Sequence, residues 1–165
     1  MNSFLRYVIG LIFPILPETS FFALKCFLLR KTGAKIGNNV RICSSVKIVG
    51  SARLSIGNDT WIGHDVFISL ADNVNIGNCV DIAPRVIICT GSHRLDAVGK
   101  HTAGEGYTET ITIDNGVWIG IGATILPGVF IGEKSMVAAC SLVNKSIPPY
   151  TVVKGIPAKT YCNLV

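Results

Sequence analysis

The sequence predicts an all-β fold, a parallel β-helix built from six-residue repeats. Branched apolar residues recur every six positions over 36–54, 56–74, 76–88 and 113–143. A small residue, most often glycine, follows many of these anchor residues. An α-helix has a period of about 3.6 residues and a strand a period of about 2, so neither accounts for a period of six. Short repeats with β-branched anchors and glycine at corners are typical of a parallel β-helix.

Each repeat is expected to form one short strand and one corner. The anchor points into a narrow three-sided prism, and the small residue after it allows the chain to turn with an unusual φ. The repeat restarts at Ile56 and Ile76, which makes Ile36, Ile56 and Ile76 equivalent points of successive coils. Three repeats then close one coil, and coils stack through backbone hydrogen bonds around an apolar column.

Residues 1–33 precede the repeats and are expected to form a helical, apolar segment. The apolar run over 7–16 is interrupted by Gly10 and Pro14, and it is shorter than the roughly 20 residues that a membrane-spanning helix needs. A second helix is expected after it, capped by Thr19 or Ser20 and ended by Gly33.

Two interpretations of the first segment remain open. It packs on the body or on a neighbouring subunit, or it lies on the inner membrane surface. In the second case Arg6, Lys25, Arg30 and Lys31 face anionic lipid. A cytoplasmic protein would then be peripheral at the inner membrane through residues 1–31.

Length and composition bound the remaining choices. The chain of 165 residues is expected to hold one β-helix domain over 34–160, followed by a tail over 161–165. With 49% apolar and 15% charged residues, overall disorder is excluded. The net charge is +5, but no basic stripe with aromatic residues is present, so we expect no nucleic-acid partner. Six cysteines without a CxxC pair indicate reduced core fillers in a cytosolic protein.

The repeat is interrupted over residues 90–110, where Gly, Thr and charged residues dominate. This insert is expected to leave the prism as a loop, and functional groups concentrate on such loops. His93 stands near its start.

Several short motifs accompany the repeat, and they lie at 82–86 (IAPRV), 90–93 (TGSH), 117–120 (VWIG), 125–129 (ILPGV), 143–149 (VNKSIPP) and 153–159 (VKGIPAK). With them the sequence resembles the hexapeptide-repeat acyltransferases over 34–160, and within these it is similar to the galactoside, maltose and colanic-acid type acetyltransferases. The resemblance implies a left-handed coil and a homotrimer with its active sites between subunits. It also implies acetyl-CoA as the donor, a sugar as the acceptor and no metal.

The resemblance further implies that His93 is the catalytic base, a role that suits a neutral imidazole near pH 7. Asp96 is a candidate to orient this imidazole, and a backbone carbonyl is the alternative. His101 is expected to be exposed in the loop. Cys89 is expected to pack rather than to carry an acyl group, so we expect direct attack in a ternary complex.

On the acceptor side, Gly63 replaces an acceptor-binding asparagine of the galactoside type, and His64 or Asp65 is expected to take over. Trp118 matches a tryptophan beside the site. On the donor side, the resemblance assigns the CoA groove to Ile121, Gly122, Ala139, Asn144 and Lys145. Lys145 and Lys159 are candidates to meet the CoA phosphates. The region of Gly122 is the candidate for a backbone oxyanion donor.

The function expected is O-acetylation of a sugar hydroxyl in surface polysaccharide biosynthesis, whether O-antigen, capsule or exopolysaccharide. N-acetylation of a nucleotide-linked amino sugar is the alternative. Two distant alternatives are a zinc enzyme resembling the gamma carbonic anhydrases, which would use His64, His93 and His101, and a non-catalytic β-helix protein. The spacing of His93 and His101 disfavours the former, and the presence of His93 at the repeat break disfavours the latter.

Overall fold

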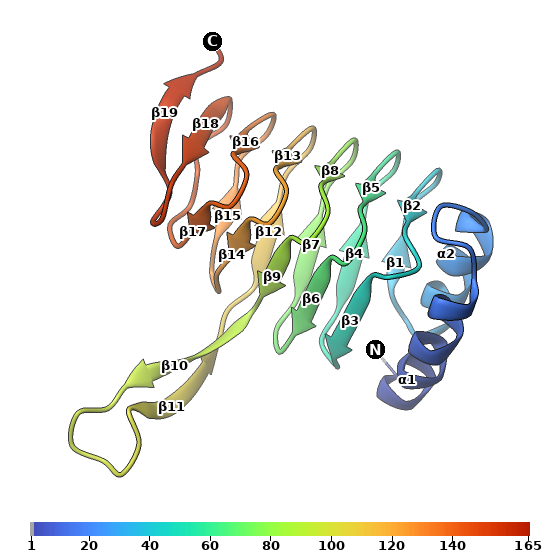
Figure 1. Cartoon of the computed structure of the whole chain (residues 1–165), viewed down its shortest axis with the longest axis horizontal. Coiled ribbons are helices and arrows are strands. Elements are labelled where there is room, and N and C mark those ends of the chain that lie inside the picture. Colours follow the sequence, from blue (N-terminus) through green and yellow to red (C-terminus); the bar gives the residue numbers. More distant parts are fainter. Residues whose placement is uncertain (1) are drawn as a thin grey trace.

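The computed structural model describes residues 2–165. It shows a three-sided β-helix with helices at one end and a long hairpin that projects from the side of the β-helix (Figure 1). Successive short strands pass to the three faces in turn, so each face is a largely parallel sheet. The expected all-β fold is confirmed, a left-handed parallel β-helix with a short helical segment and one protruding element.

Three sheets form the faces of the prism. Sheet A contains β1 (Lys35–Ile36), β4 (Leu54–Ile56), β7 (Val74–Ile76), β12 (Ile111–Ile113) and β15 (Phe130–Ile131). Sheet B contains β2 (Arg41–Ile42), β5 (Trp61–Ile62), β8 (Asp81–Ile82), β13 (Trp118–Ile119), β16 (Met136–Val137), β18 (Thr151–Lys154) and β19 (Lys159–Asn163). Sheet C contains β3 (Lys47–Gly50), β6 (Phe67–Leu70), β9 (Ile87–Cys89), β14 (Thr124–Ile125) and β17 (Leu142–Val143).

The register of the sheets follows the restarts of the repeat. In sheet A, Ile36 pairs with Ile56 and Ile56 pairs with Ile76, so residues 36, 56 and 76 are equivalent points of successive coils. The anchor residues point into the prism and are buried, except Ile48, which is half-buried beside the helices. Burial of such apolar surface contributes about 25 cal/mol per Å² and holds the stacked coils together.

The residue after an anchor is small because the coils approach closely at that point. At Gly57, a Cβ would lie 2.5 Å from the carbonyl carbon of Gly77 in the next coil. The left-handed φ occurs two residues further on, where Asn39, Asp59 and Arg85 have φ of 50°, 55° and 60°. The corners thus have the unusual φ that was expected, and the small residue before each of them leaves space for the next coil.

The helices cover the first coil at one end of the prism. They are α1 (Ser3–Ile12), the 3-10 turn η1 (Phe13–Ile15) and α2 (Phe22–Lys31), and α1 packs on β3 while α2 packs on β1 and β2. Phe21 precedes α2 with φ of 54° and caps it without a side-chain bond, so the cap expected at Thr19 or Ser20 is wrong. Gly33 ends the helix as expected, with φ of 93°. Within residues 2–165, none of the helices is both long and apolar enough to cross a bilayer.

Lys25 is buried at the centre of this helical cap. Its amine donates to the carbonyl oxygens of Pro17, Glu18 and Ile42 at 3.3, 2.9 and 3.1 Å, and thereby joins the loop before α2 to the first coil. Arg6 is also buried. The expectation that Arg6 and Lys25 face lipid is therefore wrong.

The insert over 90–110 is a β-hairpin rather than an irregular loop. Its strands, β10 (Gly91–Leu95) and β11 (Ala103–Thr108), extend far from the prism (Figure 1). The coil resumes without a register shift after it, because Ile113 pairs with Ile76. Residues 161–163 of the expected tail belong to β19, which runs antiparallel to β18.

The six cysteines are all free. Cys26 and Cys43 are buried and Cys89 is half-buried, but Cys79, Cys140 and Cys162 are exposed. The expectation that the cysteines are core fillers is therefore wrong for the last three.

Candidate active site

His93 lies on β10 and is held by the opposite strand of the hairpin. Its Nδ1 lies 2.8 Å from the carbonyl oxygen of Gly104 on β11. A carbonyl oxygen only accepts hydrogen bonds, so Nδ1 carries the hydrogen of the neutral ring and Nε2 keeps its lone pair. The imidazole is exposed. This arrangement gives an oriented ring with a free basic nitrogen, which is what a general base requires.

Two glycines on β11 lie opposite the segment that carries His93. Gly106 pairs with His93 across the hairpin, and a Cβ there would lie 3.7 Å from Cε1 of the ring. At Gly104, a Cβ would lie 2.7 Å from the Cβ of Asp96. Neither glycine was predicted as part of the site, although glycine at both 104 and 106 is unusual inside a strand and was visible in the sequence.

An open groove of about 620 Å³ lies at the base of the hairpin beside His93. Tyr107 and Glu109 line it with Pro127, which is the corner after β14. The guanidinium of Arg94 lies 5.6 Å from the centre of the Tyr107 ring. The groove therefore combines a base, an acid, a cation and an aromatic surface, of which the sequence indicated only the base.

Asp96 forms the bend of the hairpin. Its Oδ1 accepts the backbone N–H groups of Gly99 and Val98 at 2.8 and 2.9 Å, and these bonds lower the pKa of the carboxyl. The carbonyl of Gly104 takes the place at Nδ1 of His93 for which Asp96 was a candidate. His101 lies in the exposed bend between the strands, as expected.

His64 lies at the corner between sheets B and C and contacts the helical cap. Its Nδ1 lies 3.1 Å from Oε1 of Glu18, in the loop before α2. The same oxygen accepts the backbone N–H and the hydroxyl of Ser45. Asp65 is exposed with φ of 55°, and its N–H donates to the Ser45 hydroxyl at 2.8 Å. Glu18 is a further residue of this region that sequence analysis missed.

The electrostatics of this corner favour an ionised Glu18. Burial by itself raises the pKa of Glu18, but the hydrogen bonds from Ser45 and the interaction with His64 outweigh it, and the pKa is lowered. Cys43 lies close by, with ligand-type atoms of the three residues within 4.8 Å of one another. Burial and the charge of Glu18 raise the pKa of the Cys43 thiol to about 11.

The donor-side candidates lie along the last coils. Ile121 and Gly122 form the corner between sheets B and C, and the next coil stacks on them because the N–H of Cys140 donates to the Ile121 carbonyl at 2.8 Å. Ala139 precedes that cysteine and is exposed. The Gly122 N–H donates to the Pro84 carbonyl at 3.0 Å, so it is not available as an oxyanion donor.

The lysines lie near both edges of sheet C. Lys159 lies near the same edge of sheet C as Ala139. The N–H of the residue before it, Ala158, donates to the carbonyl of Leu142 at the start of β17 at 2.8 Å. Asn144 and Lys145 are exposed at the opposite edge, directly after β17. Trp118 projects from the outer face of sheet B and is 54% exposed, between Asp81 and Met136 of the adjacent strands.

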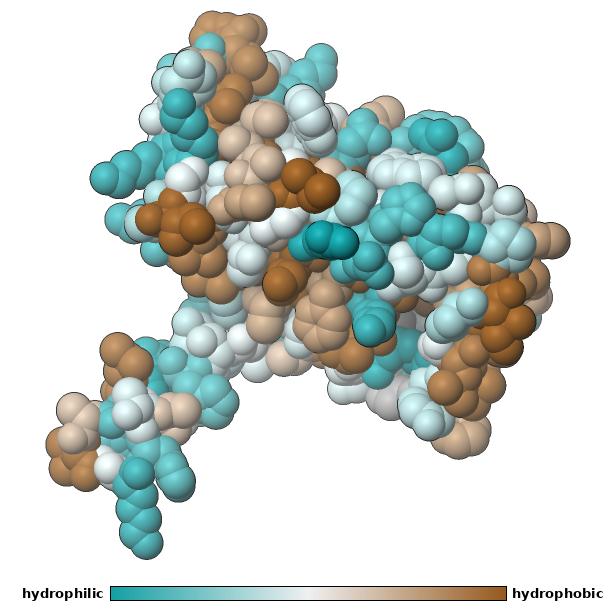
Figure 2. All heavy atoms as spheres, in the orientation of Figure 1, coloured by the Kyte–Doolittle hydropathy of each residue, from teal (hydrophilic) through white to brown (hydrophobic). Residues whose placement is uncertain are grey.

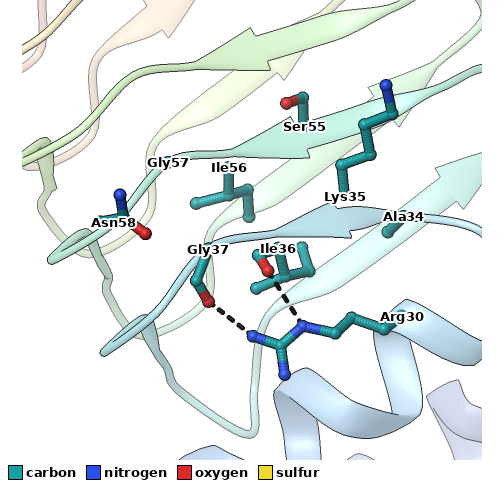
Figure 3. A pocket seen from close by; sticks show the side chains of 9 residues that line it. All are labelled: Arg30, Ala34, Lys35, Ile36, Gly37, Ser55, Ile56, Gly57 and Asn58. Carbon is teal, nitrogen blue, oxygen red and sulfur yellow. Dashed lines mark hydrogen bonds between the residues drawn. The ribbon is translucent and has the colours of Figure 1, made fainter.

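A separate hollow of about 540 Å³ lies between α2 and the first two strands of sheet A (Figure 3). The Arg30 guanidinium donates there to the carbonyl oxygens of Ile36 and Gly37 at 2.9 and 2.6 Å. These bonds fasten α2 to the first coil. The residues that line the hollow include no histidine or carboxylate, so we assign it no catalytic role.

Comparisons with known proteins agree with this architecture, although no protein-family model matches the chain. WcaF of Escherichia coli (strain K12), which is named as a colanic acid biosynthesis acetyltransferase, is 38% identical over 134 residues, covering 81% of this chain and 71% of WcaF. The galactoside O-acetyltransferase of the same strain is 34% identical over 132 residues, covering 80% of this chain and 64% of that enzyme.

Among solved structures, the hexapeptide-repeat acetyltransferase VCA0836 of Vibrio cholerae superposes with a TM-score of 0.77 at 30% identity. The match covers 98% of this chain and 91% of VCA0836. A second crystal structure of VCA0836 is a complex with acetyl coenzyme A.

The fold and these comparisons place the chain among the β-helix acyltransferases. The chain belongs to the hexapeptide-repeat acetyltransferases, so the resemblance drawn from its motifs is confirmed. It is an enzyme of acyl transfer.

Proposed function

We propose that the enzyme transfers the acetyl group of acetyl-CoA to a sugar hydroxyl of a surface polysaccharide or its lipid-linked precursor, with His93 as general base. The observation that carries the proposal is the 2.8 Å contact between Nδ1 of His93 and the Gly104 carbonyl, which leaves Nε2 free and basic. The similarity to WcaF and to the galactoside O-acetyltransferase supports a sugar hydroxyl as acceptor.

In the proposed reaction, the oxygen of the acceptor hydroxyl attacks the thioester carbonyl of acetyl-CoA while Nε2 of His93 takes the hydroxyl proton. The carbon–sulfur bond then breaks, and the imidazolium returns the proton to the departing CoA sulfur, so charge and atoms balance. No covalent acyl-enzyme is needed. Cys89 supports this view, because its half-buried thiol points to the Gly91 carbonyl at 3.2 Å.

The two substrates are assigned to different surfaces. We assign the acceptor to His64, Asp65 and Trp118, with Glu18 fixing the ring of His64 through Nδ1. The donor is assigned to Ile121, Gly122, Ala139, Asn144, Lys145 and Lys159. The small Gly122 and Ala139 leave room for the pantetheine arm, and the exposed amines of Lys145 and Lys159 bind the phosphates of CoA.

The proposal includes a homotrimer with its sites between subunits. The hairpin that carries His93 projects from its own body, and its ring is exposed, so a neighbouring subunit is needed to enclose it (Figure 1). A trimer would have three times the mass of the 17.6 kDa chain. The proposal also includes contact of residues 1–31 with the membrane that carries a lipid-linked acceptor.

The test is release of CoA from acetyl-CoA, followed across a panel of sugars, nucleotide-linked amino sugars and amino acids. We expect turnover with a hydroxyl acceptor and a loss of at least about 100-fold in His93→Ala. His101→Ala is the matched control, because His101 lies in the same hairpin, and its rate should stay within about two-fold.

Two results would change the proposal. Preferred turnover of an amino sugar would replace O-acetylation by N-acetylation at the same site. Survival of His93→Ala within a few-fold of the wild-type rate would remove His93 as the base.

A further inference from the structure

The helical cap carries a large apolar surface that the fold does not use. We call it the cap face, and its exposed side chains are Phe4 (76%), Tyr7 (66%), Leu11 (58%), Ile15 (81%), Leu24 (41%) and Phe27 (51%). Apolar residues gather over this end of the molecule in Figure 2. An apolar surface of this size on one element marks an interaction site.

Helical spacing places these residues on the outer faces of both helices. In α1, Ile9 and the following Phe13 are buried against the body, while Phe4, Tyr7 and Leu11 follow at intervals of three and four on the other face. In α2, the buried positions include Leu29, and Leu24 and Phe27 point away. The helices of the cap are thus apolar on both their inner and outer sides, although only the inner side packs against the β-helix.

Basic residues far outnumber acidic ones in the helical cap and the first coil. Residues 2–50 contain a single carboxylate, Glu18, which is already bonded to Ser45 and His64. The exposed basic residues of the same stretch are Arg30, Lys31, Lys35, Arg41 and Lys47. The Lys31 amine lies 5.1 Å from the centre of the Phe27 ring, so charge and apolar surface are adjacent. The Arg30 guanidinium is fixed at the rim by its two carbonyl bonds (Figure 3).

Arg6 is the one basic residue of α1, and it lies on the side opposite the cap face. It is buried on the side of α1 that faces the body, and its Nη1 has no hydrogen-bond partner within residues 2–165. Burial lowers the pKa of the guanidinium, which reflects the cost of an unpaired buried cation. Because it faces the body, this guanidinium does not belong to the basic groups that would meet a bilayer.

We propose that the cap face docks on a bilayer of anionic phospholipid, with its aromatic and aliphatic side chains inserted and its basic rim on the phosphates. A second copy of the chain fits less well, because two such faces would bring like charges together. This inference deepens the membrane contact of the proposed function, and it is independent of acetyl transfer because no catalytic residue lies on the cap face.

The test is co-sedimentation of the full chain with vesicles of phosphatidylcholine, prepared with and without phosphatidylglycerol, at low and high salt. We expect binding that requires phosphatidylglycerol and weakens with salt. Lys31→Gln with Lys35→Gln should weaken it about five-fold for each lysine. Phe4→Ser with Ile15→Ser should weaken it by at least about ten-fold.

Val98→Ser with Val165→Ser is the matched control, since these side chains are 97% and 92% exposed outside the cap. Its vesicle binding should equal that of the wild type. All variants should keep the wild-type melting temperature, since only exposed side chains change. Absence of binding to phosphatidylglycerol vesicles would overturn the inference. So would a change in assembled mass in Phe4→Ser with Ile15→Ser, since the cap face would then join copies of the chain.

Discussion

The carboxylate of Glu18 lies 3.1 Å from Nδ1 of His64, although the two residues are 46 positions apart in the chain. This pair ties the loop before α2 to the second coil and fixes a histidine assigned to the acceptor. The helical cap and the proposed site are therefore connected by one ionisable contact, and its strength depends on pH.

Glu18→Gln should lower the melting temperature at neutral pH. The folded state lowers the pKa of Glu18, so its ionised form stabilises the fold above the ordinary carboxyl pKa, and this contribution is lost as the pH falls through the folded-state value. Melting curves of both proteins across pH should converge below about pH 4. Glu105→Gln, at an exposed position of the hairpin, serves as control and should show no such convergence.

Gly57→Ala should destabilise the β-helix, because its Cβ would meet the backbone of Gly77 at 2.5 Å. We expect a loss of at least about 1–3 kcal/mol in urea unfolding at a fixed protein concentration. Gly10→Ala in α1 is the opposite case, since nothing lies within 4 Å of the new methyl group. It should stabilise the chain by up to about 1 kcal/mol. Similar values for both variants would contradict the close approach of the coils.

Gly104→Ala should reduce turnover while leaving the fold intact. The new Cβ would lie 2.7 Å from the Cβ of Asp96, so the strand must shift and carry with it the carbonyl that holds Nδ1 of His93. Because small misplacements of a base are costly, we expect kcat to fall about ten-fold or more. In Gly106→Ala, the Cβ would make an ordinary contact of 3.7 Å with the ring, and kcat should be nearly unchanged. Equal kcat values for the two variants would argue against the orienting role of Gly104.

Lys25→Met should destabilise the chain more than any exposed lysine. Three carbonyl oxygens, of Pro17, Glu18 and Ile42, would lose their donor while staying in a buried region. Leaving such groups unpaired costs about 1–3 kcal/mol for each that water does not reach. Lys35→Met is the control in urea unfolding, because Lys35 is exposed on β1. A Lys25→Met protein as stable as the control would show that these bonds contribute little.

The repeat predicted the coils and their register because one physical demand, an apolar residue inside a narrow prism, returns at every sixth position. The pairing of Ile56 with Ile76 follows directly from it. The same pattern did not reveal why residue 57 is a glycine. A glycine can be required because the next coil approaches closely or because the backbone has a positive φ, and the sequence does not distinguish the two. The left-handed positions escaped notice because Asn39, Asp59 and Arg85 share no residue type.

The candidate site was less predictable from sequence. His93 stands out because it interrupts a periodic pattern. Its partner is a backbone carbonyl, that of Gly104, and a backbone group leaves no trace in the residue type. Glu18 lies far from His64 in sequence, and the burial of Lys25 depends on three carbonyls that the fold brings together. The extended hairpin was expected as a loop because residues 90–110 are rich in glycine, threonine and charged residues.

A stack of identical coils has no intrinsic end, since each face offers free backbone groups to the next coil. In this chain, the helices close the first coil, and β19 runs against the direction of β18 at the other end. A further coil would need a parallel strand at that edge, so the reversed strand blocks it. At this end of the rod the reversed strand therefore covers the edge of sheet B, which hinders the stacking of another copy of the chain on that face.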